Sequence, residues 1–203
     1  MAEHNMNPVA TADRKTLVRA LAEVLPAHAL LHSEEEIRPY ECDGLTAYRQ
    51  LPLLVCLPEN EAQILAILQI CRRFNVPVVP RGAGTGLSGG AMPMAQGIVL
   101  STAKLNRILH VDAAARTAQV QPGVRNLAIS DAVAPHGLYY APDPSSQIAC
   151  TIGGNVAENS GGVHCLKYGL TLHNVLRVRL LTMEGEVLEV GSEALDSPGF
   201  DLL

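Results

Sequence analysis

A glycine-rich loop directly after a buried strand is the feature that most limits what this chain can be. Five glycines fall within residues 82–90, and residues 76–80 before them are expected to form a strand. Glycine lets the backbone reach positive φ and lets a ligand approach closely, and such a loop can turn several N–H groups toward phosphate. A plain turn rarely needs so many glycines, so we favour a phosphate-binding loop over a flexible turn.

Two common phosphate loops do not fit this segment. Gly84, Gly86 and Gly89 match the dinucleotide-binding spacing, which requires a following helix and an acidic residue about 20 positions on. Here Pro93 follows, and Lys104 stands where the acid should be. The P-loop pattern also fails, because residues 90–91 are Gly-Ala where it needs Lys-Ser or Lys-Thr. A phosphate loop of a third kind remains.

The hydrophobic pattern around the loop mixes helices and strands. Helices are expected at residues 14–25, 61–74 and 124–134. Strands are expected at residues 53–57, 76–80 and 98–101, with hairpins at 109–112/117–121 and at 175–182/186–190. Residues 1–13 are expected to be disordered and residues 33–43 to form a polar linker. This mixture predicts an α+β fold, with two small lobes.

A second segment, residues 141–162, is rich in Pro, Gly, Ser and Asn. Loops of this length inside a compact domain are uncommon and usually functional. Ile148, Ile152 and Val156 interrupt its polarity, which favours a loop packed inside the protein over a solvent loop. Packed backbone with unpaired N–H and C=O groups is suited to a polar planar ligand.

Composition excludes several classes of protein. The formal net charge is −5 and no basic block occurs, so the electrostatic footprint of nucleic-acid binding is missing. The five cysteines form no C-x-x-C pair, which favours reduced thiols in a cytoplasmic protein over a disulfide framework. No apolar run approaches the roughly 20 residues of a membrane helix, so no direct membrane insertion is expected.

Catalytic and metal-ligating patterns are not found. None of the seven histidines lies in a tight metal-ligand spacing, and each is expected to be a surface or loop residue. His164 and Cys165 are adjacent, and neighbours on a strand point to opposite faces, which argues against a working pair. Asp143 and Glu158 are candidates for paired carboxylates, but the sequence does not fix their distance. We assign no catalytic residue and no metal ligand.

These motifs resemble the FAD-binding domain shared by vanillyl-alcohol-oxidase-type and p-cresol-methylhydroxylase-type flavoproteins. The resemblance covers roughly residues 38–203 and is carried by residues 40–44, 80–90, 122–124, 142–162 and 168–169. Within this family the chain is similar to the FAD-linked subunits of bacterial glycolate oxidases, on the specific segments 141–147, 155–159 and 162–170. D-lactate and D-2-hydroxyglutarate dehydrogenases are also similar.

The resemblance implies a domain layout. Residues 1–37 would be an N-terminal tail and helix, and residues 38–203 a two-lobe α+β FAD-binding domain of the p-cresol-methylhydroxylase type, truncated at its C-terminus. The first lobe would span about residues 52–108, and the second, incomplete lobe about residues 109–203.

The resemblance also implies which residues bind FAD. The pyrophosphate would be wrapped by Arg81, Gly82, Ala83, Gly84, Thr85, Gly86, Leu87 and Ser88. The ribityl chain and flavin would lie along Pro142, Asp143, Ser145 and Ser146. The isoalloxazine ring would be bordered by Thr151, Ile152, Gly153, Gly154, Asn155, Asn159, Gly162 and Gly169, and Val187 would hold the adenine side. Some relatives bind FAD covalently through a histidine at the position of Thr85, which cannot form that bond, so FAD is expected to be non-covalent.

The implied function is that of the FAD-binding part of a 2-hydroxyacid oxidoreductase, with glycolate as the expected substrate and hydride passing to flavin N5. The family places its substrate residues and metal-binding histidines in a C-terminal domain, which would follow residue 203. The resemblance implies partner subunits, including an iron–sulfur subunit, and a cytoplasmic protein that associates with a membrane through such partners. Two alternatives stay open: a non-catalytic FAD-binding fragment and an assembly module without cofactor.

Overall fold

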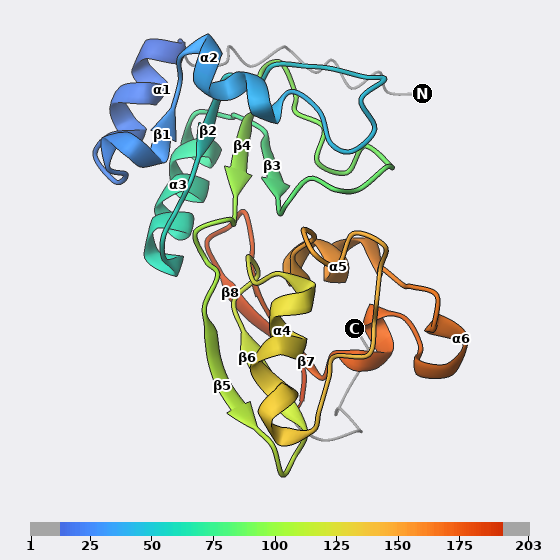
Figure 1. The fold of residues 1–203 in the computed structure, drawn as a ribbon. Helices are drawn as coiled ribbons and strands as arrows, with labels where there is room; N and C mark the ends of the chain where they lie inside the picture. Colours follow the sequence, from blue (N-terminus) through green and yellow to red (C-terminus); the bar gives the residue numbers. More distant parts are fainter. Residues whose placement is uncertain (1–12, 193–203) are drawn as a thin grey trace, which may run out of the picture.

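The computed structural model describes residues 13–192, which form two lobes that follow one another along the chain (Figure 1). The first lobe contains α1 (Arg14–Leu21), β1 (Leu30–Leu31), α2 (Glu34–Ile37), β2 (Leu54–Cys56), α3 (Glu61–Arg73), β3 (Val78–Arg81) and β4 (Ile98–Ser101). The second contains β5 (Ile108–Asp112), β6 (Thr117–Val120), α4 (Asn126–Val133), α5 (Ile152–Glu158), α6 (Cys165–Tyr168), β7 (Arg177–Leu181) and β8 (Val187–Gly191). The predicted mixed α+β composition is confirmed.

The sheet of the first lobe has the strand order β1-β2-β4-β3. Val99 of β4 lies opposite Val55 of β2 on one side and Val79 of β3 on the other, and both pairings are parallel. Every residue of β2 and β4 is buried, as expected for parallel strands that are covered on both faces. The sequence correctly predicted these three strands, and β4 separates the two that flank α3.

Helix α3 has clear signals at both ends. The Asn60 side chain caps its start by accepting a hydrogen bond from the backbone N–H of Gln63 at 3.0 Å. Just beyond its end, Asn75 adopts φ 53°, a left-handed conformation that commonly follows a helix terminus. The helix predicted at residues 61–74 is therefore confirmed almost to the residue.

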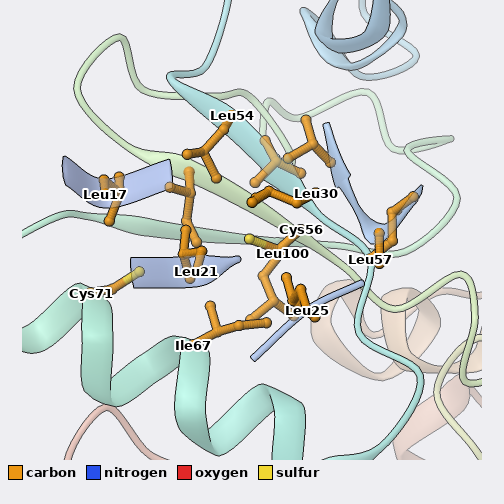
Figure 2. Packing of buried hydrophobic residues seen from close by; sticks show 14 of the residues in the cluster. Leu17, Leu21, Leu25, Leu30, Leu54, Cys56, Leu57, Ile67, Cys71 and Leu100 are labelled. Atoms are coloured by element: carbon orange, nitrogen blue, oxygen red, sulfur yellow. The ribbon is translucent and has the colours of Figure 1, made fainter. Parts of the chain in front are cut away.

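The first core is aliphatic and includes the N-terminal helix. Leu17 and Leu21 of α1 pack with Leu54 of β2 and Ile67 of α3 (Figure 2). Helix α1 ends at Leu21, earlier than the predicted residue 25, because the chain turns there toward β1. The predicted disorder falls on residues 1–12, which lie outside the described residues, and on Asp13, which precedes α1. The domain boundary at residues 37/38 stays a prediction, and α1 and β1 share the core of β2.

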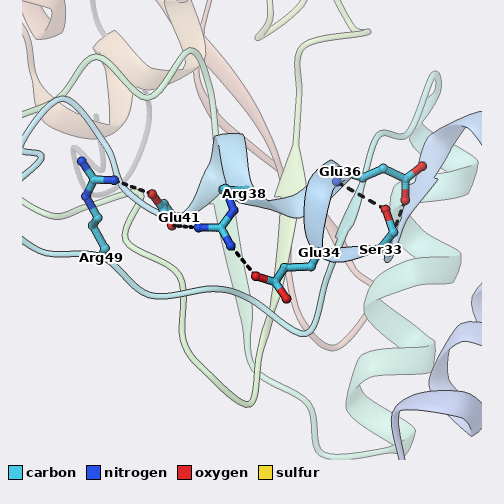
Figure 3. A network of polar contacts seen from close by, with 6 residues as sticks. All are labelled: Ser33, Glu34, Glu36, Arg38, Glu41 and Arg49. Carbon is cyan, nitrogen blue, oxygen red and sulfur yellow. Dashed lines mark hydrogen bonds and ion pairs between the residues drawn. The ribbon is translucent and has the colours of Figure 1, made fainter.

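The predicted polar linker at residues 33–43 is wrong in its first half. Ser33 and Glu36 form a capping box: Glu36 N–H donates to Ser33 Oγ, and Ser33 N–H donates to Glu36 Oε2 at 2.9 Å. This box starts α2, and a 3₁₀ turn follows at Arg38–Tyr40. Arg38 then pairs with Glu34 and Glu41, and Arg49 with Glu41, in the chain of contacts shown in Figure 3. The same polar residues that suggested a linker satisfy one another on a short helix.

The second lobe has two antiparallel hairpins, β5–β6 and β7–β8, both of which were predicted from sequence. Its small core joins Val124, Ile129 and Ile152. The expectation that residues 141–162 form one long loop is wrong, because α5 (Ile152–Glu158) lies within this segment. Ile152 and Asn155 are buried one turn apart on that helix, and Asn159 ends it at φ 47°. His164 directly precedes α6, so the expectation that it lies on a strand is wrong.

Candidate functional site

The glycine-rich loop is anchored from beneath by two buried charged residues. Arg81 Nη1 donates to the carbonyl of Cys42 at 2.7 Å, and the guanidinium lies 5.5 Å from the centroid of the Tyr40 ring. Desolvation lowers the pKa of Arg81, whose ordinary value is so high that the group stays charged. Asp43 Oδ2 accepts from the backbone N–H of Gly89 at 2.8 Å. The segment before β2 therefore holds both ends of the loop.

Packing under the loop explains one glycine of the loop, Gly84, and one of the segment beneath it, Gly44. Gly84 has φ +71°, and a Cβ there would lie 2.2 Å from Arg81 Nη2. A Cβ on Gly44, beneath the loop, would lie 2.9 Å from the carbonyl oxygens of Thr85 and Gly86. The Gly44 N–H donates to that Gly86 carbonyl at 2.9 Å. Side chains are therefore excluded where the loop crosses the 40–44 segment.

The loop meets the second lobe along α5. A Cβ on Gly82 would lie 2.4 Å from Thr151 Oγ1, at the start of α5, and a Cβ on Gly90 would lie 2.4 Å from Glu158 Oε1, at its end. Figure 1 shows α5 on the side of the second lobe that faces the first. Two segments that sequence analysis singled out separately, residues 81–90 and 151–158, thus form one contact between the lobes.

Thr151 carries a buried hydroxyl at the contact between the glycine loop and α5. The residue is 7% exposed. Within residues 13–192, its Oγ1 has no hydrogen-bond partner. An unpaired buried polar group costs free energy unless a ligand or water satisfies it. A buried hydroxyl without a partner in this range, next to a glycine that leaves no room for a side chain, is compatible with a phosphate-bearing cofactor such as FAD. The residues present therefore fit FAD.

Two buried asparagines position the second segment. Asn126, at the start of α4, donates from Nδ2 to the carbonyl of Pro142 at 3.0 Å, and its Oδ1 accepts from Asn155 Nδ2 at 2.9 Å. Its backbone N–H donates to the carbonyl of Cys150. Asn126 therefore holds residues 142–150 and α5 together. Sequence reasoning missed it; the available signal was an asparagine on the apolar face of a helix, one turn before Ile129.

Asp143 is paired with a histidine rather than with Glu158. His164 Nδ1 lies 2.5 Å from Asp143 Oδ2, and the His164 N–H donates to Asp143 Oδ1 at 3.4 Å. The hydrogen bond from His164 lowers the pKa of Asp143. The sequence left open whether Asp143 and Glu158 are paired carboxylates; in the structure Asp143 pairs with His164, and Glu158 lies against Gly90. The His164 side chain is 63% exposed, so it is a surface histidine with a defined partner.

A small cavity opens beside this pair. Its volume is about 270 Å3, and it is lined by Ser130, Tyr139, Tyr140, Ala141, Asp143, Gln147, His164 and Tyr168. The rings of Tyr139 and Tyr168 meet edge to face, with centroids 6.1 Å apart. Burial raises the pKa of Tyr140 to about 12. The cavity is thus lined mainly by polar and aromatic side chains, together with the Asp143–His164 pair.

The remaining predicted site residues occupy varied positions. Pro142 is buried and Ser145 is exposed, and the Ser146 carbonyl accepts from the N–H of Cys150. A Cβ on Gly162 would lie 2.1 Å from the Asp143 carbonyl oxygen, and Gly169 ends α6 at φ +79°. Val187 lies opposite Leu181 at the turn end of hairpin β7–β8. This hairpin contacts α3 through Arg179 and Gly185.

Two features bear on metals and membranes. Within residues 13–192, no three His, Cys, Asp or Glu side chains gather as a metal site would require. The helices in that range are also too short or too polar to span a bilayer.

Comparisons with known proteins agree with this geometry. Residues 52–191 match a family model described as FAD binding domain. The chain is 64% identical over 191 residues to the glycolate oxidase subunit GlcD of Escherichia coli (strain K12), which covers 94% of this chain and 38% of that protein. It is 42% identical over 151 residues to a D-lactate dehydrogenase of Archaeoglobus fulgidus, covering 74% of this chain and 34% of that protein.

A solved structure supports the same fold. The p-cresol methylhydroxylase structure with bound substrate matches with a TM-score of 0.75 at 18% identity, over 93% of this chain and 38% of that chain. The chain spans about two fifths of the length of the relatives it matches. Because the family model covers most of the chain, the protein belongs to the family of FAD binding domains.

Proposed function

We propose that this chain is the FAD-binding portion of a 2-hydroxyacid oxidoreductase, and that glycolate is the substrate of the complete protein. Support comes from membership of the FAD binding domain family and from the names of the relatives, a glycolate oxidase subunit and a D-lactate dehydrogenase. Both named substrates, glycolate and D-lactate, are 2-hydroxyacids, so the shared chemistry is oxidation of a hydroxyl next to a carboxylate.

The observation that carries this proposal is the contact between the glycine loop and α5. Gly82 approaches the buried hydroxyl of Thr151 so closely that no side chain fits, and that hydroxyl has no hydrogen-bond partner within the described residues. We assign the FAD pyrophosphate to residues 81–88, which lie along this contact. Backbone N–H groups bind phosphate without a lysine, which suits a loop whose one arginine is turned toward Cys42.

The rest of the cofactor is assigned to the second lobe. Residues 142–146 take the ribityl chain and flavin, residues 151–155 with Asn159, Gly162 and Gly169 border the ring, and Val187 takes the adenine side. When bound, the flavin supplies an acceptor at N5 for the hydride of the substrate. This chain contributes position and exclusion of water, and the Asn126 hydrogen bonds hold the ring-facing segments together.

FAD is non-covalent in this proposal, because the resemblance puts Thr85 where a histidine would carry the flavin. The complete protein works in the cytoplasm, with further subunits that include an iron–sulfur protein and through which it associates with a membrane. The domain boundary stays at residues 37/38.

Two measurements on the purified chain test the proposal. Titration with FAD, followed by quenching of flavin fluorescence, should saturate at one FAD per chain. Reduction of a dye with glycolate then shows whether the chain that binds FAD is also catalytically active. A chain that binds FAD without turnover would be a non-catalytic FAD-binding fragment. A chain that takes up no FAD would leave only an assembly module, and the proposal would fail.

A further inference from the structure

An arginine of the second lobe is ion-paired with the first lobe, on elements that take no part in the glycine-loop contact. Arg179, on β7, donates from Nη2 to Glu61 Oε1 at 2.8 Å and from Nε to Glu61 Oε2 at 3.0 Å. Glu61 is the first residue of α3, 118 positions away in sequence. Two parallel hydrogen bonds of this kind fix orientation as well as distance.

The same guanidinium has a second partner within its own lobe. Arg179 Nη1 donates to Glu189 Oε1 at 3.0 Å, and Glu189 stands opposite Arg179 in the β7–β8 hairpin. The hydrogen bond from Arg179 lowers the pKa of Glu61, and the two carboxylates raise that of Arg179. One arginine thus has an interlobe arm to Glu61 and an intra-hairpin arm to Glu189, which can be removed separately.

Two further contacts show that hairpin β7–β8 packs along α3. Leu181, two residues after Arg179, packs against the first core. At the hairpin turn, a Cβ on Gly185 would lie 3.5 Å from Gln69 Nε2. Glu61 and Gln69 are separated by about 12 Å of helix, and the hairpin reaches the first lobe beside α3 in Figure 1. The lobes therefore meet where the hairpin packs against α3 as well as where the glycine loop packs against α5.

We propose that the Arg179–Glu61 pair is an interlobe clamp that sets the spacing between the glycine loop and α5, so that Arg179 and Glu61 are positioning residues for FAD. This inference rests on the proposed function, in which FAD spans the contact between the lobes. A ligand that touches two lobes binds more tightly when they are already held in the bound arrangement, because less motion is lost on binding. Arg179 and Glu61 are not among the residues assigned to the cofactor, and Arg179 shares its hairpin with Val187, which is assigned to the adenine side.

The size of the effect follows from exposure. The Arg179 and Glu61 side chains are 50% and 43% exposed, so water and salt screen the pair. Exposed ion pairs of good geometry contribute little to stability, so we expect roughly a two- to fivefold change in the dissociation constant of FAD when the pair is removed.

The test compares two carboxylates of the same arginine. Glu61→Gln removes the interlobe arm. Glu189→Gln, the matched control, makes the same change in charge and removes the contacts of Glu189 within the hairpin, to Arg179 and, at 3.9 Å, to Arg177. Glu61→Gln should raise the FAD dissociation constant roughly two- to fivefold, and Glu189→Gln should change it less. Thermal melting of each apo variant shows whether both remain folded at the temperature of the titration.

A double-mutant cycle and salt complete the test. Arg179→Gln should weaken FAD binding as Glu61→Gln does, and the double variant should bind FAD no more weakly than either single variant. The differences in FAD affinity between wild type and variants should shrink at about 1 M salt, where the screening length is about 3 Å. FAD binding by Glu61→Gln and Arg179→Gln that equals wild type, or an equal loss in Glu189→Gln, would overturn the clamp while leaving the proposed function intact. A wild-type chain that binds no FAD would overturn both.

Discussion

His164 Nδ1 lies 2.5 Å from Asp143 Oδ2. This contact joins the segment before α6 to residues 142–146, which are proposed to lie along the ribityl chain and flavin. Asp143 therefore has a lowered pKa, caused first by the hydrogen bond from His164. A carboxylate whose folded-state pKa is lowered stabilises the fold above its unfolded value of about 3.9. That contribution is lost as the pH falls through the lower, folded value.

The first prediction is that His164→Ala raises the pKa of Asp143 toward its ordinary value. Carbon NMR of the carboxyl groups during an acid titration measures this directly. His136→Ala is the matched control, since His136 is exposed in the turn after α4. An unchanged Asp143 titration in His164→Ala would show that the pair does not form in solution. Because the His164 side chain is 63% exposed, we expect little change in stability near pH 7.

The second prediction concerns space at Gly82. An alanine there would put its Cβ 2.4 Å from Thr151 Oγ1. Gly82→Ala should lower the free energy of unfolding of the apo chain by about 1–3 kcal/mol, the usual cost of overpacking. Urea denaturation measures this, and Gly86→Ala serves as control because its nearest neighbour would be 3.6 Å away. Adding Thr151→Ala should recover part of the loss, and a purely additive double variant would contradict the contact.

The third prediction separates stability from binding at Thr151. Thr151→Val keeps the shape of the side chain and removes a buried hydroxyl that has no partner among the described residues. The apo chain should keep or gain stability, by up to about 1 kcal/mol, because replacing an unpaired buried polar group is often neutral or favourable. FAD binding should weaken roughly tenfold if the hydroxyl donates to the cofactor. Equal FAD affinity in the variant would remove Thr151 from the site.

The fourth prediction concerns the buried asparagines. Asn126→Ala leaves the Asn155 amide and the Pro142 carbonyl unpaired, so the free energy of unfolding should fall by about 2–4 kcal/mol. Asn155→Ala removes one shared hydrogen bond, and the double variant should lose less than the sum of the two. Denaturant unfolding of the three variants gives this comparison. Additive losses would mean that the two side chains act independently.

Sequence alone was enough for β2, β3 and β4 of the first lobe and for α3, but it missed the two-residue strand β1. The apolar runs of β2 and β4 are unambiguous, and Asn60 marks the start of the helix. It was not enough for α2, whose capping box lies in a segment that reads as polar, or for α5, whose glycines oppose helix formation. Burial of Ile152 in the second core outweighs that propensity.

Within the candidate site, sequence identified the segments but not their contacts. The glycine loop stands out by composition, whereas its approach to Thr151 depends on how two lobes meet. Pairs such as Asp143–His164 and Arg179–Glu61 join residues far apart in sequence, and no local pattern indicates a partner at that range. The roles of the individual FAD-binding residues therefore stay predictions.

The central claim is that this chain holds non-covalent FAD between its lobes, and an absorption spectrum of the purified chain tests it most directly. The sample is reconstituted with FAD, desalted, and measured before and after precipitation with acid. We predict a flavin spectrum at one FAD per chain that leaves with the supernatant. Flavin retained in the pellet would contradict the argument from Thr85, and a colourless protein after reconstitution would contradict the claim itself.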